Sequence, residues 1–370
     1  MKLGFVLGTR PEAIKLAPVI RAARRRGHDT SVISTGQHRE MLEQMLIDFD
    51  IGADHALNVM RERQQLGDLA AELMKQLSRT LQHEHPDVLV VQGDTSSAFC
   101  GALGAFYEQI PVAHVEAGLR THNIYNPFPE EANRRLVATL SRFHFCPTER
   151  SRMNLLRENV DPEAISVVGN TVIDALHWAC SRTQPLNLSP TGAGAGGRLL
   201  VTLHRRESQG DTMQGIAQAI WRLASERSLD VLFPMHRSPA VRDIVLPILK
   251  DAPNVTVAEP LDYFDFISAL QWCDVVLTDS GGVQEEAPSL GKPVLVARET
   301  TERPEAIEAG VAKLVGTSPS RIYEAVTTLF DKPDEYTAMA RTANPFGDGT
   351  ASGQILNLLD ESLTRFRKAA

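Results

Sequence analysis

Met1-Lys-Leu-Gly-Phe-Val-Leu-Gly-Thr-Arg-Pro-Glu-Ala-Ile-Lys15 begins the chain with an apolar run that passes directly into a helix-forming segment. The run Leu3–Leu7 has the length and composition of a buried strand. Pro11 suits the first turn of a helix, and Thr9 with Glu12 has the spacing of a capping box. A strand, a short turn and a helix in this order predict the repeating unit of a mostly parallel α/β sheet.

The same alternation of strand-like runs and helix-length amphipathic stretches continues along almost the whole chain. In the first half the strand-like runs are Leu3–Leu7, Thr30–Ser34, Val88–Val91, Val112–Val115, Phe143–Cys146 and Ile165–Val168. In the second half they are Leu199–Leu203, Val231–Pro234, Val255–Ala258, Val275–Thr278, Val294–Ala297 and Lys313–Val315. Between the halves, Pro185–Gly197 has the composition of a linker. We therefore predict two doubly wound parallel-sheet domains, residues 1–183 and 198–351, with the boundary near 183–198.

The composition narrows the class of protein. With 370 residues, 43% of them hydrophobic and 23% charged, the chain is globular and long enough for two domains. A net charge of -8 disfavours nucleic acid as a partner, because proteins that bind it carry a basic excess. Every apolar run falls short of the ~18 residues that cross a bilayer, so no membrane association is expected. These features predict a cytoplasmic protein.

Neither a cofactor nor a metal ion is expected. The run Gly192–Gly197 precedes a strand, whereas a dinucleotide-binding turn follows a strand and opens a helix, which disfavours bound NAD. The four cysteines are scattered without CxxC or CxxH spacing, and they predict buried, reduced thiols.

Acidic side chains follow two neighbouring predicted strands, at the sheet edge where doubly wound folds bind their ligands. Asp94 follows the run Val88–Val91, and Glu116 follows Val112–Val115. Asp94 could instead cap the helix that starts at Thr95, which is the commonest role of an aspartate at such a junction. Glu116 has no such alternative, because Ala-Gly follows it and the next helix begins later.

A third acidic position opens the next helix, in Asn126-Pro-Phe-Pro-Glu-Glu131. Glu130 or Glu131 could complement the helix dipole, or pair with Arg134 or Arg135 at helical spacing. Each carboxylate taken alone therefore has a structural explanation. Three of them at one sheet edge favour proton transfer, because crowded carboxylates are good candidate acids and bases.

Basic and glycine-containing segments predict an anionic ligand. Arg10 and Lys15 lie near a helix N-terminus, where the dipole disfavours a positive charge. In the second half, Thr278-Asp-Ser-Gly-Gly-Val-Gln-Glu-Glu286 reads as a strand, a glycine turn and a helix start, whose amides can approach a phosphate closely. Arg303 stands just before another helix-opening proline.

Three further side chains of the second half admit both structural and binding roles. Glu286 could complement a helix dipole or accept hydrogen bonds from ribose hydroxyls. His204 and His236 each follow a predicted strand and precede an arginine. We interpret this pair as contacts to phosphate or sugar.

These segments together resemble the non-hydrolysing UDP-N-acetylglucosamine 2-epimerases. The matching motifs are Gly8-Thr-Arg-Pro-Glu-Ala-Ile-Lys15, Gly93-Asp-Thr95, His114-Val-Glu-Ala-Gly-Leu-Arg120, Pro127-Phe-Pro-Glu-Glu-Ala-Asn-Arg134, His204-Arg-Arg-Glu-Ser208, Asp279-Ser-Gly-Gly-Val-Gln-Glu-Glu-Ala-Pro288, Thr300-Thr-Glu-Arg-Pro-Glu305 and Asn344-Pro-Phe-Gly-Asp-Gly349. The resemblance implies two Rossmann-like domains of the GT-B type facing a cleft, with a C-terminal helix at about 352–370 packed back on the first domain. It also implies a homodimer that interconverts UDP-GlcNAc and UDP-ManNAc without metal or NAD.

The resemblance further implies roles for individual residues. The catalytic groups carry over to Lys15, Asp94, Glu116, Glu130 and His204. The contacts to UDP-sugar carry over to Arg10, His236, Ser280, Gly281, Gly282, Glu286 and Arg303, with Phe266 at the uracil.

Bacterial members of that family are often activated by their own substrate at a second, neighbouring site. The residues that resemble parts of that allosteric site are Gln37, His38, Gln44, Arg205 and His236. Ser208 and Ser238 stand where many members carry Asn. Both departures lie near the regulatory region.

Three other functions stay open at this point. A GT-B glycosyltransferase would bind the same nucleotide, although it needs an acceptor groove and no cluster of carboxylates. A hydrolysing epimerase would release UDP and free ManNAc. A non-enzymatic nucleotide-sugar sensor is disfavoured by the intact set of Asp94, Glu116, Glu130 and His204.

Overall fold

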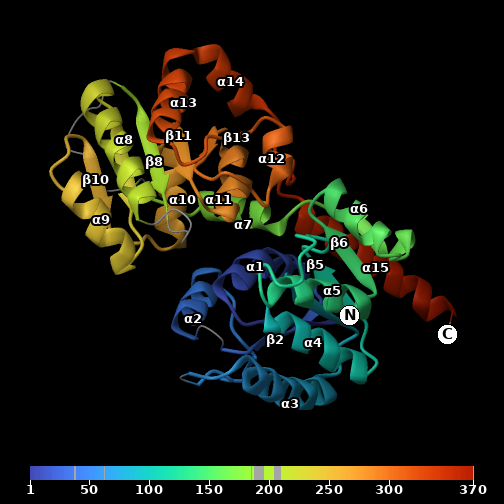
Figure 1. Cartoon of the computed structure of the whole chain (residues 1–370). Helices are drawn as coiled ribbons and strands as arrows, with labels where there is room; N and C mark the ends of the chain where they lie inside the picture. Colours follow the sequence, from blue (N-terminus) through green and yellow to red (C-terminus); the bar gives the residue numbers. More distant parts are fainter. Residues whose placement is uncertain (37–38, 62, 185, 187–195, 204–209, 370) are drawn as a thin grey trace. The chain divides into compact units, whose positions relative to one another are not determined.

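The computed structural model describes residues 1–36, 39–61, 63–184, 186, 196–203 and 210–369 (Figure 1). The chain divides into two compact units, Met1–Ala175 together with Phe346–Ala370, and Leu176–Pro345. It passes from the first unit to the second within helix α7, Thr171–Cys180, and returns at Phe346. These limits differ by a few residues from the bounds 1–183 and 198–351, which stay a prediction.

The first unit is built on a seven-stranded sheet in the order β3-β2-β1-β4-β5-β6-β7, and every neighbouring pair of strands is parallel. Its strands are β1 (Lys2–Leu7), β2 (Asp29–Ser34), β3 (His55–Ala56), β4 (Val88–Gln92), β5 (Val112–Val115), β6 (Phe143–Cys146) and β7 (Ile165–Val167). The strand order runs outward in both directions from β1 and β4, so the topological switch point lies between these two strands.

Helices cover both faces of this sheet (Figure 1). They are α1 (Arg10–Arg25), α2 (Arg39–Asp48), α3 (Leu66–Glu84), α4 (Ser96–Tyr107), α5 (Glu130–Leu140), α6 (Glu149–Arg157) and α15 (Ala351–Ala369), with a 3-10 turn η1 (Pro162–Ala164). α3, α4 and α5 pack side by side, and α1 contacts α2 and α15. Right-handed crossovers that leave the switch point in opposite directions place α1 and α4 on opposite faces. Asp360 of α15 contacts Arg26 and His28, so the C-terminal helix lies against the first unit.

The second unit contains a six-stranded parallel sheet in the order β10-β9-β8-β11-β12-β13. Its strands are β8 (Arg198–Thr202), β9 (Asp230–Pro234), β10 (Val255–Ala258), β11 (Val275–Thr278), β12 (Val294–Val296) and β13 (Ala312–Leu314). Its helices are α8 (Asp211–Arg227), α9 (Pro239–Leu249), α10 (Tyr263–Trp272), α11 (Gly281–Glu286), α12 (Pro304–Glu308), α13 (Pro319–Asp331) and α14 (Pro333–Arg341), with a 3-10 turn η3 (Ala287–Leu290). The switch point of this sheet lies between β8 and β11.

The fold class predicted from the sequence is confirmed: each unit is a doubly wound parallel sheet flanked by helices. Every predicted strand is present to within one residue at each end. β3 was not predicted, because a strand of two residues leaves no apolar run in the sequence. Three of the four cysteines are buried as predicted, and Cys180 is half-buried. In the part of the chain that the structure describes, no helix is long and apolar enough to span a bilayer.

Candidate active site

The switch point of the first sheet gathers three of the predicted side chains. β1 leads into α1, which carries Lys15, while β4 ends just before Asp94 and β5 ends just before Glu116. These strands are neighbours in the order β1-β4-β5, so their carboxyl ends meet at one sheet edge. This is the edge at which doubly wound sheets bind ligands.

Glu116 is the centre of a buried polar cluster. The Nζ atom of Lys15 lies 2.6 Å from both carboxylate oxygens of Glu116. Gln92 donates to Oε2, and Asn170 donates to Oε1 at 3.1 Å. Glu116 also has a φ angle of +63°, which a residue with a Cβ seldom adopts. Such backbone strain gathers at functional sites, where the surroundings hold it in place.

Asp94 is held by helix α5. Arg134 donates through Nε to Oδ2 of Asp94 at 2.7 Å, and Asn133 donates to its backbone carbonyl at 2.8 Å. Burial raises the pKa of Asp94, and the positive charge of Arg134 opposes this increase. Thr95 accepts a hydrogen bond from the Ala98 amide and thus caps α4. The capping role considered for Asp94 is therefore filled by its neighbour.

The two adjacent glutamates at the start of α5 have different environments. Glu131 is fully buried and accepts hydrogen bonds from the amides of Thr121 and His122, at 3.0 and 3.2 Å. Arg134 also donates to Glu131 at 3.2 Å, so the pairing considered for this segment belongs to Glu131. Glu130 is half-exposed, and no hydrogen bond or ion pair joins it to Asp94 or Glu116 among the described residues. Because positions three and four apart share a helix face, Glu130 lies on the face of α5 that carries Asn133 and Arg134.

Glu12 ties the β1–α1 turn to the β4–α4 turn. Its Oε2 accepts from the amides of Gly8 and Thr9, at 3.0 and 2.8 Å, and its Oε1 accepts from the Thr95 hydroxyl at 2.7 Å. The predicted capping box of Thr9 and Glu12 is present. Burial raises the pKa of Glu12, although these hydrogen bonds favour the carboxylate. Glu12 therefore fixes the segments on which Arg10 and Asp94 stand.

His114 supports the turn before Asp94. Its Nε2 lies 2.8 Å from the carbonyl oxygen of Gly93, so Nε2 carries the proton and donates it. The ring is buried, and burial lowers the pKa of His114 to about 3, which keeps the imidazole neutral.

The switch point of the second sheet places the glycine turn after β11. Gln284 donates to the Ser280 carbonyl at 3.0 Å and accepts from the Thr301 hydroxyl at 2.6 Å. The Arg303 amide donates to the Thr301 oxygen at 3.0 Å, and the Arg303 side chain pairs with Glu285. These hydrogen bonds and this ion pair fix the Ser280–Gly282 turn and Arg303 relative to each other.

Gly281 and Gly282 have room for a side chain. A methyl group on Gly281 would lie 3.9 Å from the Arg303 guanidinium, and one on Gly282 would lie 3.8 Å from Oε2 of Glu286. Tyr263 donates to Oε1 of Glu286 at 3.3 Å. The protein's own packing therefore does not require glycine at these two positions.

The chain matches a known protein family over most of its length. Residues 21–360 match the family model described as UDP-N-acetylglucosamine 2-epimerase. The chain belongs to this family.

Relatives match the chain over almost its whole length. The UDP-N-acetylglucosamine 2-epimerase of Salmonella typhimurium is 47% identical over 369 residues, with 97% of this chain and 98% of the relative covered. The structure of UDP-GlcNAc 2-epimerase from Neisseria meningitidis bound to UDP-GlcNAc is 43% identical, with a TM-score of 0.87 and coverage of 98% and 100%. The Methanocaldococcus jannaschii enzyme in complex with UDP-GlcNAc and UDP is 33% identical, with a TM-score of 0.77 and coverage of 98% and 100%. The predicted family, GT-B fold and enzyme class are thus confirmed.

The roles of several further residues predicted for the site of this epimerase-family chain stay predictions. His204, Arg205, Gln37 and His38 lie outside the described residues. In the second unit, His236 is exposed, and its Nδ1 accepts from the Ser238 amide at 3.1 Å. In the first unit, exposed Gln44 donates to Asp48 at 2.7 Å. Phe266 is half-buried on α10 and Arg10 is half-buried at the start of α1, and their roles stay predictions.

The sequence reasoning missed the residues that support the acidic side chains. Gln92 is the last residue of β4, and Asn170 follows β7 closely, so both obey the strand-end rule that singled out Asp94 and Glu116. Applying that rule to amides as well as to charges would have found them. Tyr263 lacked any such signal, because its contact with Glu286 joins two separate helices.

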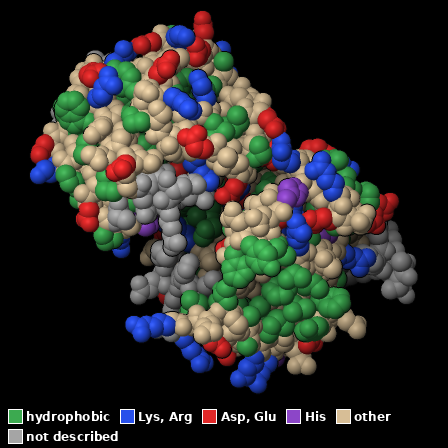
Figure 2. Space-filling model, viewed as in Figure 1, with side chains coloured by type: hydrophobic (Ala, Val, Ile, Leu, Met, Phe, Trp, Pro, Cys, Tyr) green, Lys and Arg blue, Asp and Glu red, His purple; other side chains and the backbone are tan. Residues whose placement is uncertain are grey.

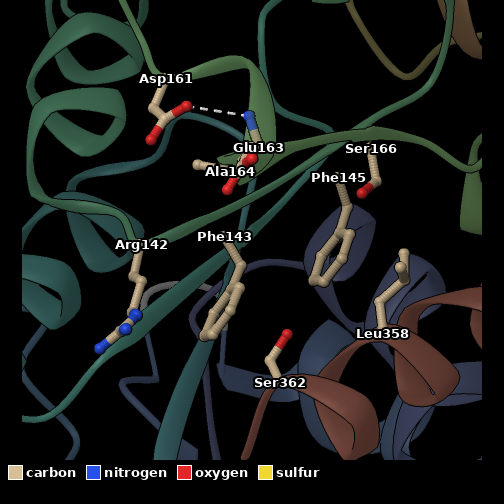
Figure 3. A pocket seen from close by; sticks show the side chains of 9 residues that line it. All are labelled: Arg142, Phe143, Phe145, Asp161, Glu163, Ala164, Ser166, Leu358 and Ser362. Atoms are coloured by element: carbon tan, nitrogen blue, oxygen red, sulfur yellow. Dashed lines mark hydrogen bonds between the residues drawn. The ribbon is translucent and has the colours of Figure 1, made fainter. Parts of the chain in front are cut away.

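A pocket of about 340 Å³ lies elsewhere on the first unit (Figure 3). It is lined by residues at the amino ends of β6 and β7 and by α15, among them Arg142, Phe143 and Leu358. Asp161 accepts from the Glu163 amide at 3.0 Å on its rim. None of the predicted site residues lines this pocket, which lies at the sheet edge opposite to Asp94 and Glu116.

Proposed function

We propose that the protein interconverts UDP-GlcNAc and UDP-ManNAc by eliminating UDP and adding it back. The observation that carries this proposal is the group of buried Glu116 with half-buried Asp94 and Lys15 at the switch point of the first sheet, in a member of the epimerase family. ManNAc units produced in this way would serve cell-surface or specialised glycans.

The chemistry of the sugar explains why this route needs carboxylates. C1 is held in a glycosyl phosphate bond, so no carbonyl group acidifies the C2 proton. In the elimination a base takes the C2 proton, the C–H electron pair forms the C1=C2 bond, and the C1–O bond breaks with its pair passing to UDP. The product is 2-acetamidoglucal. Re-addition of UDP at C1, with a proton delivered to the opposite face of C2, gives the epimer.

The first unit supplies side chains suited to the proton transfers. Glu116 is buried and Asp94 is half-buried in an ion pair with Arg134, and positioned carboxylates of this kind are effective acids and bases. Lys15 neutralises Glu116 and limits the repulsion between the two carboxylates. Glu130, on the face of α5 that grips Asp94, is the third candidate.

The second unit supplies groups suited to the leaving diphosphate. The amides of the Ser280–Gly282 turn begin α11, and neither glycine carries a Cβ that would keep a phosphate away from them. Arg303 is fixed beside this turn, and a guanidinium can stabilise the charge that develops on departing UDP. Glu286, which accepts a hydrogen bond from Tyr263, is the candidate acceptor for the ribose hydroxyls.

Incubating the purified protein with UDP-GlcNAc in D₂O tests the reaction. We expect deuterium at C2 of both UDP-GlcNAc and UDP-ManNAc without any acceptor, as followed by NMR. A glycosyltransferase would leave C2 unlabelled, and a hydrolysing enzyme would accumulate UDP and free ManNAc. Either result would exclude the proposed reaction.

Gly282→Ala tests the UDP contact without disturbing the fold. The added methyl group has no close neighbour in the protein, so we expect an unchanged melting temperature. It would occupy the approach of the diphosphate, so the Kd for UDP should rise at least about tenfold, or ~1.4 kcal/mol. Gly67→Ala on α3 is the matched control, because an added methyl there has nothing within 4 Å and lies far from the turn in sequence. Equal affinity of both variants for UDP, measured by calorimetry, would refute the contact.

We also propose a homodimer that forms through the first unit. Apolar side chains gather on the face over α4 and α5 (Figure 2). α4 has no charged residue, and Phe106 and Tyr107 at its end are exposed by 57% and 63%. Light scattering should give twice the chain mass for the protein and the single mass for Phe106→Glu. A monomeric parent protein would contradict this assignment.

A further inference from the structure

Arg134 of α5 forms an ion pair with the side chain of Asp94. Arg134 donates through Nε to Oδ2 of Asp94 at 2.7 Å, with its own side chain 11% exposed. Asn133 holds the backbone carbonyl of the same aspartate at 2.8 Å. Two successive residues of one helix therefore fix both the position of Asp94 and the direction of its carboxylate.

Arg134 is itself anchored at a second point. Its Nη1 donates to Oε2 of Glu131 at 3.2 Å. Glu131 is fully buried and receives the amides of Thr121 and His122, so its carboxylate is held by the backbone of the loop before α5. Because a guanidinium is planar and rigid, two anchors on separate nitrogens leave it no freedom to turn away from Asp94.

We propose that Arg134 is a positioning residue, anchored by Glu131, that holds the Asp94 carboxylate in a fixed ion pair and orients it for proton transfer at C2. This inference rests on the proposed function, in which Asp94 exchanges a proton with the sugar. It assigns to the Arg134–Glu131 pair a part in the reaction that goes beyond holding α5 in place.

The charges around Asp94 explain why this arginine matters. The charged groups that act on Asp94 are Arg134 from α5, Glu116 from the end of β5 and Lys15 from α1. Lys15 contacts both oxygens of Glu116 at 2.6 Å, so its charge is largely balanced there. Burial raises the pKa of Asp94, and Arg134 is the largest opposing influence. Without Arg134, burial and the charge of Glu116 would both favour the protonated acid.

The experiment is the pH dependence of kcat/KM for UDP-GlcNAc, measured on the whole protein between about pH 5 and 9. Removing an adjacent opposite charge raises a carboxyl pKa by about 1–3 units. In Arg134→Gln, the limb of the profile that reports Asp94 should therefore move to higher pH by about that amount. A shifted acidic limb means that the free enzyme uses Asp94 as a base, and a shifted alkaline limb means that it uses Asp94 as an acid.

Arg135→Gln is the matched control. It removes the same charge from the next position of α5, where the side chain is 42% exposed and lies 3.6 Å from Glu131 without contacting Asp94. Its profile should coincide with that of the parent protein. Arg134→Lys keeps the cation without the two-point anchor, so its limb should lie between those of the parent and Arg134→Gln.

The measurements distinguish a wrong role for Arg134 from a wrong proposed function. If the parent protein does not place deuterium at C2, the function itself is wrong. If it does, and Arg134→Gln loses activity equally at every pH, Arg134 is merely structural and the inference is overturned. Should Arg134→Gln fail to fold, Glu131→Gln and Arg134→Lys carry the test, and a midpoint unmoved in both overturns the inference.

Discussion

Replacing Asp94 by Asn is expected to lower kcat for UDP-GlcNAc epimerisation by about 10²–10⁴-fold, the usual contribution of a positioned acid or base. Asparagine keeps the shape of the side chain and can still accept from Nε of Arg134, which lies 2.7 Å from Oδ2 in the parent. It cannot accept or return a proton. The loss should therefore appear in kcat, with KM for UDP-GlcNAc changed much less.

The melting temperature distinguishes a loss of the proton-transfer group from a loss of structure. Arg134 keeps its ion pair with Glu131 when Asp94 is replaced by Asn, so this variant should unfold at a temperature close to that of the parent. Asp161→Asn is the matched control, because this exposed aspartate caps η1 at the opposite sheet edge. The Asp161→Asn variant should have the same kcat for UDP-GlcNAc as the parent. Nearly normal turnover in Asp94→Asn, with its melting temperature retained, would remove Asp94 from the mechanism.

The parts of the fold that the sequence predicts are those with a local signal. Strands of three or more residues leave apolar runs, and the residues that follow such a run stand at the sheet edge at which doubly wound folds bind their ligands. That rule placed Lys15, Asp94 and Glu116 at one edge, and the Ser280 turn at the corresponding edge of the second sheet. It says nothing about β3, whose two residues pair with β2 only after the chain has folded.

The supporting contacts of the site have no local signal. Helical spacing predicted an arginine partner for the glutamates of α5, and Glu131 has one. The same arginine also reaches Asp94, forty residues earlier in the chain. Asn170 likewise meets Glu116 across fifty-four positions. Such contacts depend on which strand ends become neighbours, so they follow from the strand order and cannot be derived from spacing along the sequence.

The ion pair of Lys15 and Glu116 provides the second large effect, on stability. Lys15→Met should lower the free energy of unfolding by about 3 kcal/mol, because removing one partner of a buried pair leaves the other charge uncompensated. Glu116 has a side chain only 4% exposed, so water cannot replace the ammonium group. Gln92 and Asn170 still donate to the carboxylate, which places the expected loss at the lower end for such pairs.

The double variant Lys15→Met with Glu116→Gln should be more stable than Lys15→Met alone, because it buries no unpaired charge. Urea denaturation of the parent, both single variants and the double variant measures this coupling. We expect the double variant to fold yet to lack turnover, since neither the acid–base group nor its cation is present. A double variant as unstable as Lys15→Met would mean that the lysine acts through its packing rather than its charge. Recovery of stability without activity would show that the fold tolerates uncharged side chains at these two positions. The buried ion pair of Lys15 and Glu116 would then be retained for the reaction.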